Sequence, residues 1–317
     1  MTLLRFLLLA LIAPLAASFA GCGPDASTSR SLSERPVRIV ATTSMVADLA
    51  REVGGDRVEV VGLMGAGVDP HLYKASEGDV GRMAAADLIL YNGLHLEGKM
   101  VDVLERLGDR AAAVTDDIDR SQLTSPPAFA GNYDPHVWMD VSMWRDAVGT
   151  VAERLAALDT AHADSYRARA ATYEQRLDSL DAWVRSEVER LPAEQRILVT
   201  AHDAFGYFGR AYGFDVHGLQ GISTATEAGT ADVQNLAAFV AEREVPALFV
   251  ESSVPARSIE AVREAVRARG HDVEIGGNLY SDALGGTGSG AEDYVGMIRH
   301  NVSTIVDALV GEPVAQR

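Results

Sequence analysis

Short apolar runs rich in β-branched residues alternate with amphipathic segments along the chain from Val37 onward. The short runs are typical of strands, and the segments between them carry apolar residues at the three- to four-residue spacing of helices. Strands that alternate with helices form βα units around a mainly parallel sheet. The pattern therefore predicts an α/β fold.

The predicted elements fall into two similar halves. In the first half, strands are predicted at residues 37–42, 58–63, 88–91 and 112–114, and helices at 45–53, 77–85 and 98–107. In the second half, strands are predicted at 197–201, 216–219, 248–251 and 273–276, and helices at 204–212, 231–243, 256–269 and 294–309. Because each half has its own strands and helices, we expect two (β/α) lobes with mainly parallel sheets.

A long segment without glycine or proline, residues 161–191, lies between the halves. Its apolar positions step by three or four and are Tyr166, Ala170, Tyr173, Leu177, Leu180, Val184, Val188 and Leu191. This spacing predicts one backbone helix of about 30 residues, about 45 Å long, along the flank of both lobes. A coiled-coil dimer is the alternative, but so short a stripe between two α/β halves favours packing within one chain, and we expect a monomer. The expected division is an N-terminal lobe at 37–160, the linking helix, and a C-terminal lobe at 192–317.

The start of the chain is typical of an exported and anchored protein. Arg5 supplies a positive charge and residues 6–17 an apolar run before a small-residue cleavage point, so residues 1–21 are predicted to be a signal peptide. Cys22, the only cysteine, follows directly, as in a lipoprotein box whose cysteine becomes the lipidated N-terminus. A plain secreted protein that retains one thiol is the alternative. The apolar run is too short to span a bilayer, so we expect a periplasmic or cell-surface protein held by acyl chains through a flexible tether at residues 22–36.

The acidic composition disfavours nucleic acids as partners. The chain has 28 Lys and Arg residues against 45 Asp and Glu residues, a formal net charge of −17. Nucleic-acid binding relies on basic surfaces, so no nucleic-acid partner is expected. A negative surface attracts cations without selecting among them, and the charge therefore supports a cation-binding role only weakly.

Four residues in short Gly-, Asp- or Pro-containing segments are candidate metal ligands. They are His71 in GVDPHLYKASEGD, His136 in NYDPHVWMD, His202 in TAHDAFGYF and Asp282 in GGNLYSDALGG. Three neutral imidazoles and one carboxylate suit a divalent cation such as zinc. Each segment lies beside a predicted strand or helix, and ligands of α/β proteins collect at the carboxyl ends of strands. Because two residues come from each half, we expect the metal in a cleft between the lobes.

Taken singly, each of these residues is commoner as a surface or turn residue than as a ligand. The triplet Asp-Pro-His occurs twice, at residues 69–71 and 134–136. Each Asp can start a turn or orient its histidine from behind, and the turn role is favoured. The other histidines lack such a setting and are interpreted as structural or surface residues: His95, His162, His217, His271 and His300.

The common catalytic signatures are absent from the sequence. It has no CxxC, HExxH, GxSxG or phosphate-loop string. The split of the candidate ligands between the halves predicts a transport binding protein that is not an enzyme. A secreted mononuclear metallohydrolase is the alternative. Such an enzyme keeps one coordination position of the metal open for water and has a general base nearby. Glu251, at the end of a predicted strand, is the candidate base, and a hydrogen bond to a metal-binding side chain explains this residue equally well.

Several longer strings resemble one known family. They are VATTSMVADLA, GLMGAGVDPHLYKASEGDV, ADLILYNGLHLEGKM, DPHVWMDV, VTAHDAFGYFGRAYGF, LQGISTATEAG, FVESS and GGNLYSDALG. Together they resemble the zinc/manganese solute-binding lipoproteins of bacterial ABC transporters, most of all the TroA-like members, over about residues 37–309. The resemblance implies two lobes joined by one backbone helix, with a divalent metal captured in the cleft. It also implies delivery of that metal to a membrane permease that a cytoplasmic ATPase powers, with ligands at His71, His136, His202 and Asp282.

The resemblance leaves the transported metal open. Many manganese-selective relatives have Glu where this chain has His202, and many zinc-specific relatives have a His-rich loop where residues 108–132 here contain no histidine. Three imidazoles favour zinc, and manganese lies at the bottom of the divalent affinity series, so we expect zinc binding in vitro and zinc or manganese as cargo. Release is expected through the Gly-rich loop around Asp282. A surface adhesin is a further alternative, for which the sequence has no recognisable motif.

Overall fold

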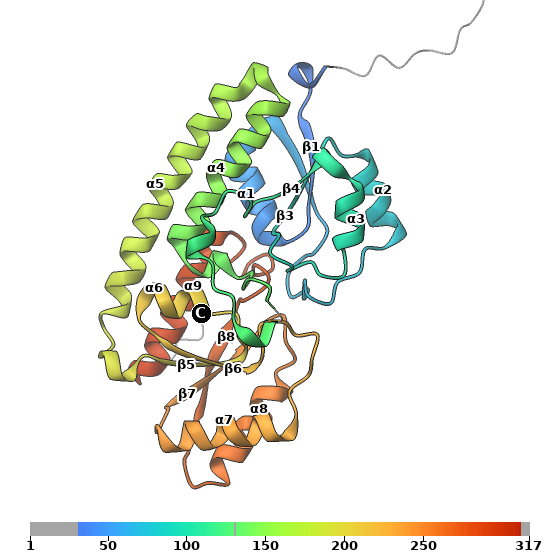
Figure 1. Ribbon diagram of the computed structural model, residues 1–317. Helices are drawn as coiled ribbons and strands as arrows, with labels where there is room; N and C mark the ends of the chain where they lie inside the picture. The colour runs from blue at the N-terminus through green and yellow to red at the C-terminus, as the bar shows by residue number, and fades with distance from the viewer. Residues whose placement is uncertain (1–30, 130, 312–317) are drawn as a thin grey trace, which may run out of the picture.

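Two α/β lobes are joined by one long helix in the computed structural model of the chain, which describes residues 31–129 and 131–311 (Figure 1). The predicted signal peptide, Cys22 and the first part of the tether lie outside the described residues. Each lobe contains parallel strands with helices packed on them, so the predicted fold class is confirmed. Within the part of the chain that the structure describes, no helix is both long and apolar enough to cross a bilayer.

The N-terminal lobe is built on a parallel sheet with the strand order β2-β1-β3-β4. Its strands are β1 (Val37–Ala41), β2 (Val58–Gly62), β3 (Leu88–Tyr91) and β4 (Ala111–Ala113), and its helices are α1 (Ser44–Gly54), α2 (Glu77–Ala85) and α3 (Val101–Arg106). Polar caps begin two of these helices: Thr43 accepts a hydrogen bond from the Val46 amide at α1, and Ser76 and Asp79 form a capping box at α2. Because all four strands are parallel, their carboxyl ends lie at one edge of the sheet, where binding loops can gather.

The C-terminal lobe contains two parallel strand pairs that lie side by side. The pairs are β5 (Ile197–His202) with β6 (Asp215–Gln220), and β7 (Ala247–Glu251) with β8 (Glu274–Leu279). Strands β5 and β7 contact each other, so the four strands form one layer. The helices are α6 (Gly206–Tyr212), α7 (Thr230–Glu242), α8 (Arg257–Arg267) and α9 (Tyr294–Val310).

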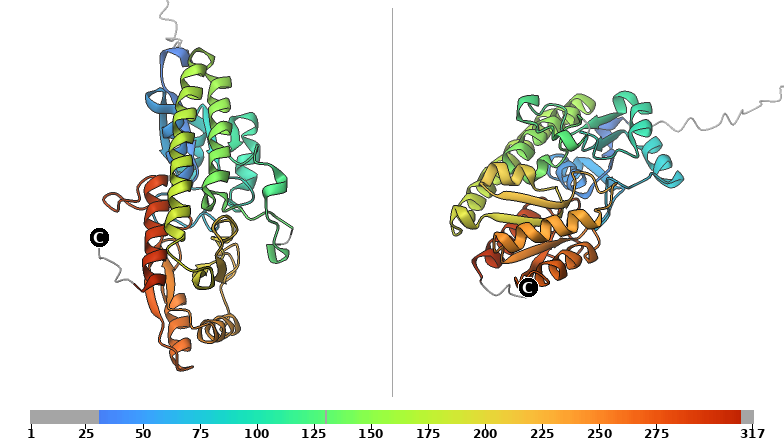
Figure 2. Two further views of the ribbon diagram at one scale, coloured as in Figure 1. Left: turned by 90° about the vertical axis from the view of Figure 1, so that its left-hand side faces the viewer. Right: turned by 60° about the horizontal axis from the view of Figure 1, so that its bottom comes forward.

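The linking helix α5 (Ala163–Val188) packs on α1 and α4 at one end and on α6 and α9 at the other (Figure 2). It has 26 residues and is shorter than the predicted helix, because the chain first makes a 3-10 turn at Thr160–His162. Asp159 holds this turn by accepting hydrogen bonds from His162 Nδ1 at 2.9 Å and from the Tyr166 hydroxyl at 2.8 Å. The predicted long helix is confirmed, and its first two residues, Ala161 and His162, belong to the 3-10 turn.

Helix α4 (Val141–Leu158) was not predicted, although it packs along much of α5. The sequence does contain features that predict this helix. Asp140 caps it by accepting the Ser142 amide, and buried apolar residues follow at helical spacing: Val141, Trp144, Val148, Val151 and Leu155. The two antiparallel helices α4 and α5 form the flank of the molecule in Figure 2.

One hydrophobic core runs through both lobes. It contains residues of α1, α4, α5, α6 and α9, and Leu284 beyond β8 also belongs to it. A second core lies between β5, β7 and the helices α7 and α8. Trp144 of the N-terminal lobe stacks on Tyr294 at the start of α9, with ring centroids 5.5 Å apart. The lobes are thus packed together along the α5 side, and large separation there would expose this core to water.

Candidate metal centre

The structure brings His71, His136, His202 and Asp282 together between the lobes. His71 lies in the loop after β2, His136 directly precedes a 3-10 turn at Val137–Met139, His202 ends β5, and Asp282 follows β8. Each residue offers one ligand atom, and these atoms all lie within 4.8 Å of one another. All four side chains are buried, and the most exposed, His71, has 4% of its surface accessible.

The atoms that face the centre of this cluster lack hydrogen-bond partners. Among the described residues, Nε2 of all three histidines and Oδ1 of Asp282 are buried without one. The Asp282 carboxylate lies 3.4 Å from His136 Nε2 and 3.2 Å from His202 Nε2. Buried polar atoms without partners cost free energy, and four of them converging on one point suit a bound cation. The donor set, three nitrogens and one carboxylate, is that of a zinc-like ion.

Two of the imidazoles are held from behind by carboxylates. Asp134 Oδ1 lies 2.7 Å from His136 Nδ1, and Glu251 Oε2 lies 2.6 Å from His202 Nδ1. A carboxylate at Nδ1 fixes the tautomer that turns the Nε2 lone pair toward a metal and strengthens the nitrogen as a donor. The same carboxylates also accept the backbone N–H groups of His136 and His202 at 3.0 and 2.8 Å, so that ring and backbone are fixed together.

The two Asp-Pro-His triplets differ in what their aspartates do. Asp69 has the favoured turn role, since its Oδ1 accepts the His71 N–H at 2.8 Å. Asp134 accepts the backbone N–H of His136 in the same way, and it also contacts the Nδ1 of the His136 ring. The prediction that favoured only the turn role was therefore wrong for Asp134. Glu251 contacts both the backbone N–H and the ring Nδ1 of His202.

Burial and charge shift the pKa values of the cluster in opposite directions. Burial lowers the pKa of His71 to about 3, although Asp282 partly offsets the effect. Burial also acts against protonation of His136, but the carboxylates of Asp134 and Asp282 outweigh it and raise the pKa of His136 to about 9. In the same way, Asp282 and Glu251 hold the pKa of His202 well above its usual value. Despite burial, the neighbouring histidines hold the pKa of Asp282 well below its usual value.

The loop that carries Asp282 is fastened to the N-terminal lobe on both sides of this residue. The Trp138 indole N–H donates to the Ser281 carbonyl at 2.8 Å, and the Leu284 amide donates to Ser44 Oγ at 2.8 Å. These contacts argue against the expectation that release begins in this loop. Sequence reasoning missed Trp138 and Ser44, although Trp138 lies only two residues after His136.

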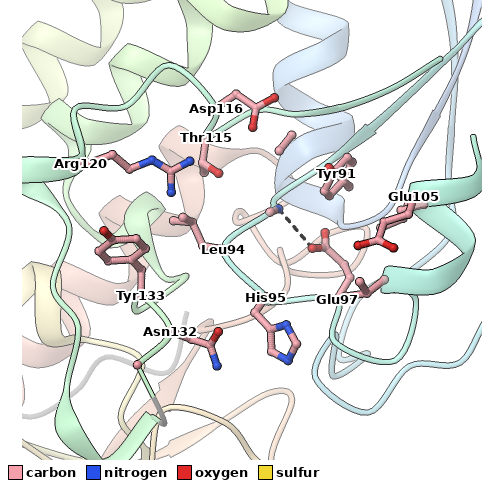
Figure 3. A pocket seen from close by; sticks show the side chains of 15 residues that line it. Tyr91, Leu94, His95, Glu97, Glu105, Thr115, Asp116, Arg120, Asn132 and Tyr133 are labelled. Carbon is pink, nitrogen blue, oxygen red and sulfur yellow. Dashed lines mark hydrogen bonds between the residues drawn. The ribbon is translucent and has the colours of Figure 1, made fainter. Parts of the chain in front are cut away.

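A separate hollow of about 410 Å³ lies beside β3, and none of the four candidate ligands lines it (Figure 3). Its wall includes Glu97, which is buried and accepts the Gly93 amide at 3.2 Å, the contact dashed in Figure 3. Arg120 covers the Tyr133 ring on another side. His95 lies exposed at this hollow and is not one of the four residues of the cluster.

The other histidines have local partners that suit structural roles. His162 contacts Asp159, and His217 contacts Asp215 at 3.0 Å. His271 and His300 each place Nε2 2.9 Å from a backbone carbonyl oxygen. None of them lies in the four-residue cluster.

Known proteins match this chain over most of its length. The family model described as zinc-uptake complex component A periplasmic (ZnuA) matches residues 39–308. The zinc-binding protein TroA of Treponema pallidum is 53% identical over 273 residues, which cover 86% of this chain and 88% of TroA. The manganese-binding lipoprotein MntA of Bacillus subtilis is 47% identical over 301 residues, which cover 94% of this chain and 97% of MntA. The solved structure of the periplasmic zinc binding protein TroA from Treponema pallidum has a TM-score of 0.84 at 52% identity, over 86% of this chain and 99% of that one.

Proposed function

Since this chain belongs to the ZnuA family of metal-uptake components, we propose that it captures a divalent metal outside the cytoplasm and delivers it to an ABC transporter. The relatives are named for zinc in one case and manganese in the other, and either metal fits the proposal as cargo. Its partners are the membrane permease and the ATPase of that transporter. The observation that supports it most directly is the set of four buried ligand atoms that face one another without partners.

In this proposal His71, His136, His202 and Asp282 are the metal ligands. Asp134 and Glu251 hold two of the imidazoles, and each lobe supplies part of the shell. Three nitrogen donors favour zinc over manganese in vitro. The metallohydrolase alternative loses its candidate base, because both Glu251 oxygens are occupied by the backbone and ring of His202. An adhesin role has no support in the geometry of the cluster.

The test is a titration of the demetallated protein with zinc and with manganese. We expect one metal per chain, zinc displacing manganese, and a higher thermal unfolding temperature with either metal. At a metal concentration 1,000 times the Kd, binding adds about 4 kcal/mol to the free energy of unfolding. Isothermal titration and thermal scans measure both effects. Failure to bind either metal below micromolar concentrations would count decisively against the proposal.

A lipid anchor on Cys22 is the second part of the proposal, and it rests on the sequence around this cysteine. A relative named as a lipoprotein, MntA, supports it. Replacing the acceptor thiol in Cys22→Ser should move the protein from the membrane fraction to the soluble fraction of its host, because no acyl chains hold it there. Immunoblots of the fractions measure the shift, and zinc binding of the soluble variant serves as the folding control. Retention of Cys22→Ser in the membrane fraction would contradict a lipid anchor.

The mature protein is proposed to be a monomer, which light scattering checks.

A further inference from the structure

The four proposed ligands are not held equally well. His136 and His202 have carboxylates behind their rings, and the Asp282 loop is bonded to the other lobe on both sides. The His71 ring, in contrast, makes no hydrogen bond to any described residue. Its ring is restrained by burial and by packing against the rings of His136 and His202, and His71 is the least buried of the four side chains. The position of His71 therefore depends on what fixes its backbone.

Asp69 fixes that backbone, and the opposite lobe fixes Asp69. Oδ1 of Asp69 accepts the His71 N–H at 2.8 Å, while Oδ2 accepts the Thr224 hydroxyl at 2.6 Å. Thr224 lies in the C-terminal lobe, in the loop between β6 and α7, and is 8% exposed. Each carboxylate oxygen thus has one partner, and the two bonds connect Thr224 of one lobe to His71 of the other.

We propose that Thr224 is a positioning residue whose hydrogen bond to Asp69 holds the His71 loop closed over the metal and so sets the metal dissociation rate. This inference rests on the proposed function, because it takes His71 as a metal ligand. Thr224 itself need not touch the metal. It acts through Asp69 and the His71 backbone, and it links the two lobes on the side away from α5.

The surroundings of this bond allow the loop to move once the bond is broken. A cavity of about 320 Å³ lies beside it, with Asp69, Leu72 and Thr224 in its wall. Leu72, next to His71, is 49% exposed, so this side chain adds little apolar burial against an outward movement. Val68 and Tyr73 pack against the N-terminal core, so the movement is confined to the residues between them. The other three ligands keep their supports in such a movement. His71 is therefore the first ligand to leave, and the Asp69–Thr224 bond controls that step.

The experiment compares the full-length zinc-loaded protein with Thr224→Val and Thr224→Ser. A stopped-flow chase with excess of a chromophoric zinc chelator gives the dissociation rate, and mixing the apo protein with zinc gives the association rate. A hydrogen bond to a charged acceptor contributes about 1.5 kcal/mol or more, so Thr224→Val should release zinc at least about tenfold faster. Thr224→Ser keeps the hydroxyl and should release zinc at nearly the wild-type rate. Association should change less than threefold in both variants.

A double-mutant cycle separates this role from a general loss of stability. In the Asp69→Ala background the hydroxyl has no acceptor, so adding Thr224→Val should not speed release further. Thr224→Ala provides a second variant without the hydroxyl, and it should behave as Thr224→Val does, with an apo unfolding temperature close to wild type. Equal acceleration by Thr224→Ser, or an undiminished effect of Thr224→Val on Asp69→Ala, would overturn the proposal. A zinc dissociation rate of Thr224→Val equal to that of the wild type would also overturn the proposal, but it would leave the assignment of the four metal ligands unaffected. If the wild-type protein binds no zinc, the proposed function fails instead.

Discussion

Replacing Asp282 by alanine is expected to weaken zinc binding by about 100- to 1,000-fold. A four-ligand zinc site contributes about 10–16 kcal/mol of binding free energy, so one ligand accounts for about 3 kcal/mol or more. Asp282 is also the one anion among the four facing side chains, lying between His136 Nε2 and His202 Nε2. Its loss removes charge neutralisation as well as a ligand. Competition with a chelator of known affinity measures the change.

The matched control is Asp116→Ala. Asp116 lies in the separate hollow beside β3, and its side chain is 44% exposed. Zinc affinity of this variant should stay within about twofold of wild type, because solvent and salt screen an exposed charge. The Asp282 loop keeps its bonds from Trp138 and to Ser44 in Asp282→Ala, so the apo protein should still fold. Its unfolding temperature should fall, because the carboxylate between the imidazoles of His136 and His202 is gone. Wild-type affinity in a folded Asp282→Ala protein would contradict the assignment of Asp282 as a ligand.

The alternation of apolar runs and amphipathic segments was sufficient to predict the strands. Strand β3 has the predicted bounds, and the others differ by at most a few residues at their ends. The prediction was poorest at α4, which was missed although its apolar residues have helical spacing, and at the break between α4 and α5. The break depends on Asp159, whose side chain holds a 3-10 turn through His162 and Tyr166. Such a local competition between side chain and backbone is not visible in hydrophobic spacing.

The four facing residues could be found from the sequence because each lies in a distinctive string at the end of a strand or beside a turn. Their supports were harder to find. The partner of Asp69 is Thr224, which is 155 positions away, and no local pattern connects the two. Likewise, Glu251 meets His202 only because β7 lies beside β5. The strand order of the second lobe decides that contact, and the order is a property of the tertiary structure.

These supports divide the site into a fixed part and a movable part. His136 and His202 are hydrogen-bonded to the buried carboxylates of Asp134 and Glu251, and the residues on either side of Asp282 are bonded to the other lobe. His71 is connected through Asp69 to a loop of the other lobe. A transport protein must hold its cargo tightly and still release it at the permease. With His71 as a proposed ligand, restraint by one interlobe hydrogen bond would meet both needs, because breaking that bond leaves the supports of His136, His202 and Asp282 in place.

Zinc affinity is expected to rise steeply with pH up to about pH 9, by ten- to a hundredfold per pH unit between pH 6 and 8. The pKa of His136 is raised to about 9, and the pKa of His202 is also raised, so both rings carry a proton near neutral pH in the metal-free protein. Metal binding must displace these protons, and each proton released contributes a factor of ten per pH unit. The pKa of His71 is lowered to about 3, so His71 is already neutral and contributes no proton. We therefore expect one to two protons released per zinc at pH 7.5, which calorimetry in buffers of different ionisation enthalpy measures.

The sign of this dependence follows from which state holds the protons. They bind the metal-free protein and not the zinc complex, so lowering the pH favours the free state and weakens binding. In Asp134→Asn the carboxylate that raises the pKa of His136 is gone, and this variant should release about one proton fewer and show a shallower slope. Asp116→Ala should match the wild type in both respects. An affinity that stays flat from pH 8 to pH 5, or the release of three protons, would contradict the arrangement in which two imidazoles are held charged by Asp134, Glu251 and Asp282 while the third is kept neutral by burial.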